Sequence, residues 1–186
     1  MKRFFLLVGL VLAVMLPAGA GQDYQPKAGE TVLKLAVEGR GNVFIRLFTK
    51  EAPRTTSRII ELTREGFYNG QKFHRVVRNP RPYLVQIGAP GSRTKSIDDD
   101  SLLSEGTGRK VAYEDSGFSN NAEGMVGLSA EPDNRDTGDC QFYITLAPAK
   151  FLDGNYTVFG KVVAGMDVVK KIEKSDRLVS ATVIGG

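Results

Sequence analysis

The sequence predicts a mainly β protein, built as one sandwich or barrel. Apolar and polar residues alternate in many short runs, which is the pattern of strands with one buried face. Turns rich in Gly and Pro separate these runs, as in all-β domains. Residues 21–186 are enough for one hydrophobic core. The single cysteine, Cys140, allows no internal disulfide, so packing must supply the stability.

The chain begins with the layout of a secretory signal peptide. Lys2 and Arg3 form a basic start, residues 4–16 are apolar, and residues 17–20 end in an Ala-x-Ala pattern. The apolar run is shorter than the roughly 20 residues that a membrane-spanning helix needs. We therefore expect residues 1–20 to be cleaved, leaving a domain at 21–186 with no stable membrane anchor. The mature protein is then expected in the periplasm or outside the cell.

Composition and charge exclude several kinds of partner. The net charge of +4 falls to +2 without the leader, which carries two cations and no acid. The basic residues are scattered and accompany no nucleic-acid-binding motif, so we expect no nucleic-acid partner. His74 is the only histidine, and no carboxylates have metal-ligand spacing, so we expect no metal and no cofactor. We expect a monomer.

The first predicted elements are a hairpin and a helix. Apolar residues alternate at 33–37 and again at 43–47, on either side of a Gly-containing turn. A helix is expected at 52–65, because Pro53 stands near its start and Gly66 just past its end. Its inward stripe would consist of Thr55, Ile59 and Leu62.

Further strands and a second helix complete the predicted domain. The helix is expected at 166–174, with Met166, Val169 and Ile172 on one face and lysines on the other. Residues 89–123 are rich in Gly, Asp and Ser and are expected to be mostly loop. The remaining strands are expected at 72–77, 83–88, 124–129, 141–146, 157–163 and 178–184.

The only histidine of the chain stands beside an arginine, at His74 and Arg75. Neighbours on a strand point to opposite faces, so we expect these two side chains in different environments. A lone histidine among apolar residues is most often buried and structural. Arginine stays charged and donates hydrogen bonds without taking up a proton. Arg75 therefore suits a reaction that needs positive donation, and a surface salt bridge is the alternative.

Three other features have a chemical and a structural interpretation. As a nucleophile, Cys140 would need His74 as its base, whereas at the start of an apolar strand it is expected to be a small packed residue. Residues 98–100 are consecutive aspartates without the spacing of a calcium loop, so a solvated loop is expected. The sequence GTGRK at 106–110 lacks the spacing and the following helix of a phosphate loop.

Three segments, in this order, resemble the cyclophilin family of peptidyl-prolyl cis–trans isomerases: FHRVV at 73–77, GDCQFYITL at 138–146 and FLDGNYTVFGKVVAGMDVV at 151–169. The resemblance covers nearly all of the mature chain. It implies a closed eight-stranded antiparallel β-barrel with two capping α-helices and a substrate groove across the outer wall. With the leader, it implies an exported bacterial member.

The resemblance also implies functional residues. Arg75 matches the catalytic arginine of the family and Gln86 matches the glutamine of its groove, so both are expected to be catalytic. The residues implied in substrate binding are Tyr83, Leu84, Ala130, Gln141, Tyr143, Phe151, Leu152 and Tyr156.

The chain departs from the family pattern at several places, and four of them have expected consequences. Phe151 replaces Trp, which keeps an apolar wall but removes a donor and should weaken binding of the family's cyclic-peptide drug. Ala130 stands where many members have Asn and offers only backbone groups. Residues 87–89 replace Gly-Gly-Asp, which is expected to affect the local strand geometry. The sequence RNPRP at 78–82 is a stiff insertion whose arginines are expected to favour acidic neighbours in a client chain.

The implied reaction is rotation about an Xaa-Pro amide bond. Resonance gives this bond a barrier of ~18–20 kcal/mol, and in the twisted state the nitrogen lone pair can accept a hydrogen bond. Arg75 is expected to donate to that nitrogen only in the twisted state. We therefore expect a peptidyl-prolyl isomerase acting on proline-containing segments of exported proteins. The alternative is a low-turnover chaperone or a proline-peptide binding module on the same barrel.

Overall fold

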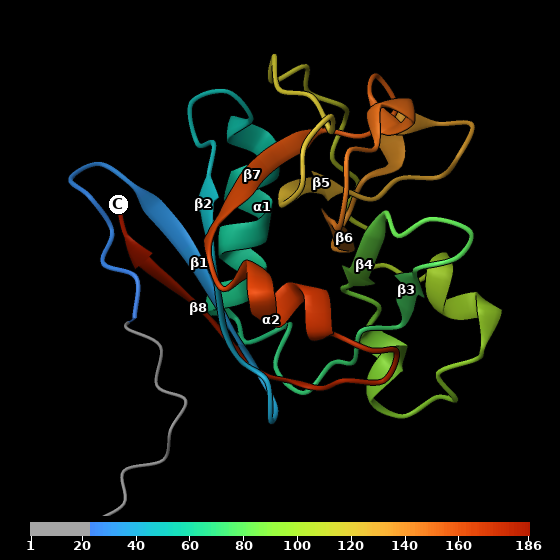
Figure 1. Cartoon of the computed structure of the whole chain (residues 1–186). Coiled ribbons are helices and arrows are strands. Elements are labelled where there is room, and N and C mark those ends of the chain that lie inside the picture. The colour runs from blue at the N-terminus through green and yellow to red at the C-terminus, as the bar shows by residue number, and fades with distance from the viewer. Residues whose placement is uncertain (1–22) are drawn as a thin grey trace, which may run out of the picture.

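The computed structural model describes residues 23–186, so the expected signal peptide lies outside the described residues. One antiparallel sheet of eight strands forms a curled half-barrel, in the order β3-β4-β6-β5-β7-β2-β1-β8 (Figure 1). The mainly β class and the eight strands are confirmed. The strands are β1 Thr31–Val37, β2 Gly41–Leu47, β3 Arg75–Val77, β4 Leu84–Ile87, β5 Met125–Leu128, β6 Phe142–Thr145, β7 Val158–Ala164 and β8 Leu178–Gly185.

The expected hairpin is the pair β1–β2. Leu33 lies opposite Ile45 and Leu35 opposite Val43, and all four side chains are fully buried. Alternation along both strands therefore sends one row of side chains into the core. The same core contains Phe142 and the inward residues of β4, β5, β7 and β8.

The two helices pack against this core, and in Figure 1 α2 lies in front of the sheet and α1 lies behind it. Helix α1 spans Pro53–Arg64, and its expected inward stripe is buried. The carboxylate of Glu114 accepts from the backbone N–H groups of Arg54 and Thr55 at 3.0 and 2.8 Å. These are two of the donors that a helix start leaves without a partner inside the helix. Helix α2 spans Met166–Lys171 and ends before the expected residue 174.

Strands β3 and β8 stand at the two ends of the sheet order. The segment before β3 exchanges backbone hydrogen bonds with β8 and the residues before it. Gly70 N–H donates to the Leu178 oxygen at 2.7 Å, and Phe73 N–H donates to the Asp176 oxygen at 2.9 Å. The expected strand 72–77 is therefore divided: its first residues contact the β8 side, and β3 proper begins at Arg75.

The segment expected to be loop, 89–123, contains two short 3₁₀ turns, Pro90–Arg93 and Asp100–Leu103. Two more lie at Arg135–Thr137 and Lys150–Leu152. Among the residues that the structure describes, no helix has the length and apolar character to cross a membrane.

The insertion at 78–82 connects β3 to β4. The guanidinium of Arg78 donates to the backbone oxygens of Lys170 and Ile172 at 2.8 and 2.7 Å, at the C-terminal end of α2. Arg78 Nη2 is thus engaged by the end of α2, and the preference of the inserted arginines for acidic client residues stays a prediction. Arg81 is exposed to solvent.

Candidate active site

Strand alternation places a group of polar and apolar side chains on the outer face of the sheet. Val85 and Ile87 of β4 enter the core, which leaves Leu84 and Gln86 on the outer side. In the strand register Gln86 is paired with Arg75 on β3 on one side and with Tyr143 on β6 on the other. The expected catalytic pair and one aromatic residue thus lie side by side on three neighbouring strands.

The guanidinium of Arg75 is held by two neutral acceptors. Its Nη1 donates to Gln86 Oε1 at 3.2 Å, and its Nη2 donates to the hydroxyl of Tyr83 at 2.9 Å. Its Cζ also lies 5.9 Å from the centre of the Tyr83 ring, which is within range of a cation–π contact. Within residues 23–186, Arg75 forms no ion pair. Its charge is therefore not neutralised by a carboxylate.

An apolar cluster lies next to this guanidinium. Leu84, Tyr143 and Leu152 are buried in it, and Tyr83 and Tyr156 pack against it half-buried. The rings of Tyr143 and Tyr156 meet edge to face, with centroids 5.7 Å apart. Phe151 is 66% exposed and meets the Tyr83 ring edge to face at 5.3 Å. The structure thus brings together Tyr83, Leu84, Tyr143, Phe151, Leu152 and Tyr156, all expected from the sequence.

The hydroxyl of Tyr143 is buried and donates to Asn120 Oδ1 at 3.0 Å. The amide of Asn120 in turn donates to the carboxylate of Asp153 at 3.0 Å. Burial raises the pKa of Tyr143, so this phenol stays neutral and donates. Asn120 was not expected at the site, because it lies in the long loop, where no periodicity marks the residues that point inward.

Gln141 lies beneath the outer surface of the site. Its Nε2 donates to the backbone oxygens of Leu102 and Glu105 at 2.7 and 2.8 Å, and its Oε1 accepts from Gln86 Nε2 at 2.8 Å. The side chain therefore has no free donor for a bound peptide. Gln86 Nε2 also lies 3.2 Å from the hydroxyl oxygen of Ser129, a contact that the sequence did not indicate.

His74 lies on the same side of the sheet as Arg75, so the expectation of separate environments is wrong. Its Nε2 donates to Gln141 Oε1 at 3.0 Å, and the side chain is 4% exposed. Alternation does not apply here, because β3 begins at Arg75 and His74 precedes it. Burial lowers the pKa of His74 to about 4, so the imidazole is neutral at physiological pH.

Two open hollows flank the 3₁₀ turn Asp100–Leu103, and Leu103 lines both. The first hollow has a volume of about 190 Å³ and includes the expected residue Ala130 together with Ser129 and Gln141. Lys110 and Glu131, also in its wall, form an ion pair at 3.7 Å. The second hollow, of about 160 Å³, includes both His74 and Arg75. Ala130 and Arg75 therefore line different hollows.

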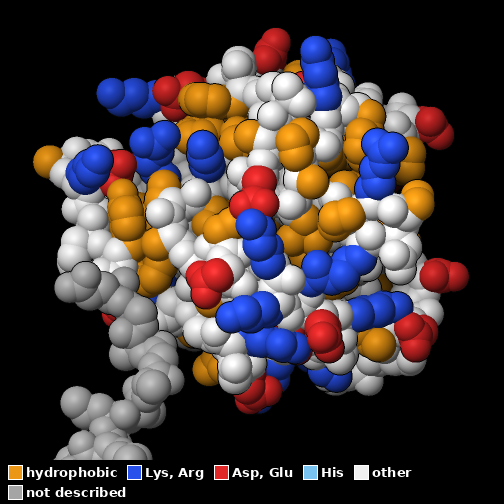
Figure 2. Space-filling model, viewed as in Figure 1, with side chains coloured by type: hydrophobic (Ala, Val, Ile, Leu, Met, Phe, Trp, Pro, Cys, Tyr) orange, Lys and Arg blue, Asp and Glu red, His pale blue; other side chains and the backbone are white. Residues whose placement is uncertain are grey.

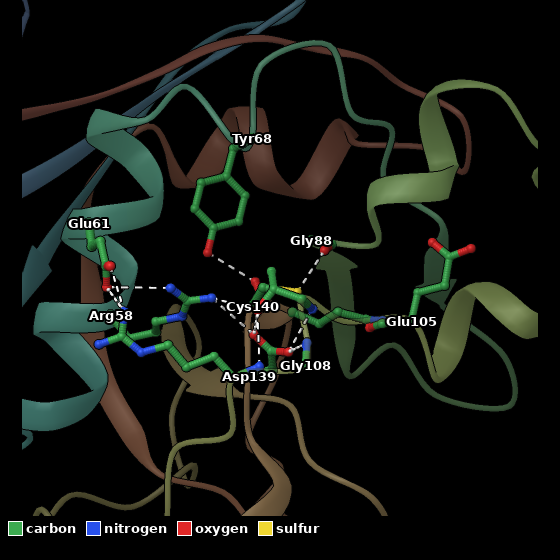
Figure 3. Close-up of polar contacts among 11 residues, drawn as sticks. Arg58, Glu61, Tyr68, Gly88, Glu105, Gly108, Asp139 and Cys140 are labelled. Atoms are coloured by element: carbon green, nitrogen blue, oxygen red, sulfur yellow. Dashed lines mark hydrogen bonds and ion pairs between the residues drawn. The ribbon is translucent and has the colours of Figure 1, made fainter.

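The Cys140 thiol is part of the packed core. The side chain is fully buried, and its Sγ donates to the backbone oxygen of Gly88 at 3.3 Å (Figure 3). Burial raises the pKa of this thiol to about 12, and the imidazole of His74 bonds to Gln141 instead. The geometry favours the packing interpretation over the nucleophile.

Figure 3 shows the carboxylate of Asp139 between helix α1 and the loop at 106–110. It accepts from the N–H groups of Thr107 and Gly108 at 2.6 and 2.9 Å and pairs with Arg58 at 3.4 Å. The backbone donors that a phosphate would need in this loop are therefore taken by Asp139. Nowhere in residues 23–186 do three or more His, Cys, Asp or Glu side chains gather as a metal site.

Charges on the surface are mixed. Figure 2 shows lysines and arginines interspersed with acids and hydrophobic side chains on the face viewed. The aspartates at 98–100 are partly engaged: Asp98 pairs with Lys174 at 2.5 Å, and Asp99 accepts from the backbone of Ser101 at 2.9 Å. The fold and the site together define a mainly β protein in which the guanidinium of Arg75, held by neutral side chains, lies beside an apolar cluster on the outer face of the sheet.

Comparison with known proteins identifies the family. Residues 32–184 match the family model described as "Cyclophilin type peptidyl-prolyl cis-trans isomerase/CLD". A peptidyl-prolyl cis-trans isomerase of Helicobacter pylori is 34% identical over 148 residues, which are 76% of this chain and 80% of the relative. The chain therefore belongs to the cyclophilin-type peptidyl-prolyl cis–trans isomerases, and the reaction implied by the sequence resemblance is confirmed.

Solved structures support the fold. A cyclophilin-type peptidyl-prolyl cis-trans isomerase of Cryptosporidium parvum superposes with a TM-score of 0.70 at 18% identity, covering 84% of this chain and 99% of that one. The same protein, crystallised in the presence of the dipeptide Ala-Pro, gives a TM-score of 0.69 at 17% identity, covering 83% of this chain and 99% of that one.

Proposed function

We propose that this isomerase acts through Arg75, which donates a hydrogen bond to the prolyl nitrogen when the Xaa-Pro amide is twisted. In the planar ground state the nitrogen lone pair is shared with the carbonyl and is a poor acceptor. A donor that gains its partner only on twisting lowers the barrier without tightening ground-state binding. No bond is cut, and no proton has to leave the enzyme.

The apolar cluster next to Arg75 is proposed to hold the proline ring. Leu84, Tyr143 and Leu152 offer buried apolar surface, while Phe151 extends an exposed aromatic face beside Tyr83. Gln86 anchors the guanidinium through its Oε1, while its Nε2 is engaged by Gln141 and Ser129, so its proposed part is to hold Arg75 in place. At about 1.4 kcal/mol per tenfold, a millionfold acceleration needs about 8 kcal/mol. A charged donor in a partly dry site, together with anchoring of the ring, supplies energies of that order.

The observation that carries the proposal is the set of partners around Arg75. A guanidinium paired with a carboxylate would have to break that pair in order to serve a substrate. Here the partners are a neutral amide and a neutral phenol, which orient the guanidinium and leave its charge available. The crystals of the Cryptosporidium parvum protein with Ala-Pro support a proline-containing peptide as the ligand of this chain too.

The test is protease-coupled isomerisation of a short Ala-Pro peptide by the wild type, Arg75→Ala and Arg64→Ala. Arg75→Ala is expected to lower kcat/KM by at least about a hundredfold, the scale of a lost electrostatic donor. Arg64→Ala removes an exposed arginine from the last turn of α1 and serves as the matched control. A full rate in Arg75→Ala would overturn the role of Arg75. A slow wild type that still suppresses aggregation of an unfolded client would indicate the binding module instead.

We further propose that the enzyme works as a monomer on proline-containing segments of exported proteins, in the periplasm or outside the cell. The support is the leader, with its basic start, apolar run and Ala-x-Ala ending at Ala20.

We also infer that the half-barrel is closed. The hydrogen bonds that join residues 70–73 to residues 176–178 support closure between the two ends of the sheet. Closure would leave no free sheet edge for unwanted pairing outside the cell.

A further inference from the structure

A chain of hydrogen bonds with one fixed direction ends on Arg75. It begins at the backbone oxygens of Leu102 and Glu105, which can only accept. Both therefore take the Nε2 hydrogens of Gln141, at 2.7 and 2.8 Å. This fixes which way the amide of Gln141 faces, with its Oε1 turned toward Gln86 and His74.

Two donors converge on that oxygen. Gln86 Nε2 lies 2.8 Å from it and His74 Nε2 lies 3.0 Å from it. Because an amide oxygen only accepts, His74 must carry its proton on Nε2. Gln86, having turned its Nε2 toward Gln141, presents its Oε1 to Nη1 of Arg75 at 3.2 Å. Each side chain thus fixes the orientation of the next, from the backbone oxygens of Leu102 and Glu105 to the guanidinium of Arg75.

All three linking side chains are held away from water. Gln86, His74 and Gln141 are 2%, 4% and 4% exposed. In such surroundings a polar side chain that loses its partner cannot replace it with solvent, so it shifts to find another. A change at His74 is therefore transmitted through Gln141 Oε1 to Gln86, and from Gln86 to Arg75.

We propose that His74 is a positioning residue for the isomerase reaction, acting on Arg75 through Gln141 and Gln86. It lies outside the apolar cluster proposed to hold the proline ring, and its hydrogen bond is to Gln141 and not to the guanidinium. Its Nε2–H fixes the acceptor on which Gln86 depends, and Gln86 fixes the plane of the guanidinium. This role rests on the proposed function of Arg75, and it differs from the purely structural part expected for a buried histidine.

The test compares His74→Leu, which removes the donor, with His74→Gln, whose Nε2 places an N–H at nearly the same reach. His74→Leu is expected to lower kcat about tenfold with little change in KM, because a displaced catalytic group costs rate rather than binding. His74→Gln is expected to restore most of the rate. Val43→Ala, in the core of β2, is the control for lost packing and is expected to lower Tm without lowering kcat.

A double-mutant cycle separates positioning from general damage. If His74 acts through Arg75, adding His74→Leu to Arg75→Ala changes the rate by less than about twofold, since coupled residues are not additive. NMR provides a second readout. The imidazole ¹⁵N signals of the wild type should show the Nε2–H form, and the Arg75 guanidinium signals should shift in His74→Leu but not in Val43→Ala.

Equal losses for His74→Leu in both backgrounds, or unchanged Arg75 signals, would overturn the positioning role. So would a full rate in folded His74→Leu. These outcomes differ from failure of the proposed function, which would appear as a full rate in Arg75→Ala itself.

Discussion

Arg58, Arg75 and Arg78 carry the same guanidinium group but meet different partners. Arg58 is buried against Asp139, and Arg78 binds the backbone oxygens at the end of α2. Only Arg75 of the three is held by neutral side chains beside an apolar cluster. The motif at 73–77 singled out Arg75 correctly as a neighbour of Gln86. It could not show what Arg78 binds, because the partner is a pair of backbone oxygens about 90 residues further along the chain.

The depressed pKa of His74 makes a prediction about stability and pH. The pKa falls from 6.5 to about 4, chiefly because the imidazole is buried. The Arg75 charge lowers it further, while the hydrogen bond that His74 donates to Gln141 and the charge of Glu105 oppose the shift. The unfolded chain therefore takes up a proton at higher pH than the folded one. The resulting stability is complete above about pH 6.5 and is lost as the pH falls toward 4, by at most about 3 kcal/mol.

Urea unfolding of the wild type and His74→Gln, at several pH values from 7 to 4, measures this loss. Carboxylates also titrate in that range, so the quantity of interest is the difference between the two proteins. The advantage of the wild type should shrink as the pH falls. Parallel stability profiles for the two proteins would contradict a neutral, buried His74.

At the scale of elements, periodicity predicted the strands and helices well and the turns between them poorly. The hairpin β1–β2 and the buried stripe of α1 follow the expected alternation and spacing. The 3₁₀ turn Asp100–Leu103 has no comparable pattern, yet the backbone oxygen of Leu102 helps to orient Gln141. Asn120 was missed for the same reason, since it contributes through one polar atom in an irregular segment. Ser129 follows the last residue of β5 within the strand expected at 124–129, and alternation does not show which side chain its hydroxyl contacts.

The buried pair of Arg58 and Asp139 predicts unequal costs for two substitutions near α1. Asp139→Ala removes the buried carboxylate partner of Arg58, leaving it only the partly exposed Glu61, and frees the N–H groups of Thr107 and Gly108. It should lower the free energy of unfolding by about 3–5 kcal/mol. Glu61→Ala removes a solvent-accessible carboxylate that pairs with both Arg58 and Arg109, and it should cost much less. Urea titrations measure the free energy of unfolding of both variants. Equal losses would show that burial of the Arg58–Asp139 pair is unimportant.

At the scale of the whole molecule, the class of fold, the number of strands and the reaction were all predictable. Repeated period-two runs predicted the sheet, and three segments covering much of the chain resembled one family closely enough to imply its architecture. The contacts of His74 were not predictable, because the alternation of side chains holds only inside a strand and His74 precedes β3. The network beneath Arg75 depends on where a strand begins, which alternation alone does not specify.

The leader predicts how the mature chain begins. Expression of the whole sequence in a bacterium with two membranes should yield a processed protein whose first residue is Gly21, recovered from the periplasmic fraction. N-terminal sequencing and fractionation measure both outcomes. Replacing residues 4–16 with a polar run is the control and should leave the full chain in the cytoplasm. A processed protein with a different first residue would correct the cleavage site, and an unprocessed cytoplasmic wild type would contradict export.

The supports of Arg75 come from distant parts of the chain. Gln86 and Gln141 are 55 residues apart, and His74 and Gln141 are 67 residues apart. Contacts between residues so far apart form late, because the chain must first lose the entropy of closing the long loop between them. A partly synthesised or partly collapsed copy thus holds the arginine without the frame that aims it. Newly made copies of this isomerase should therefore become active only after these distant contacts have formed.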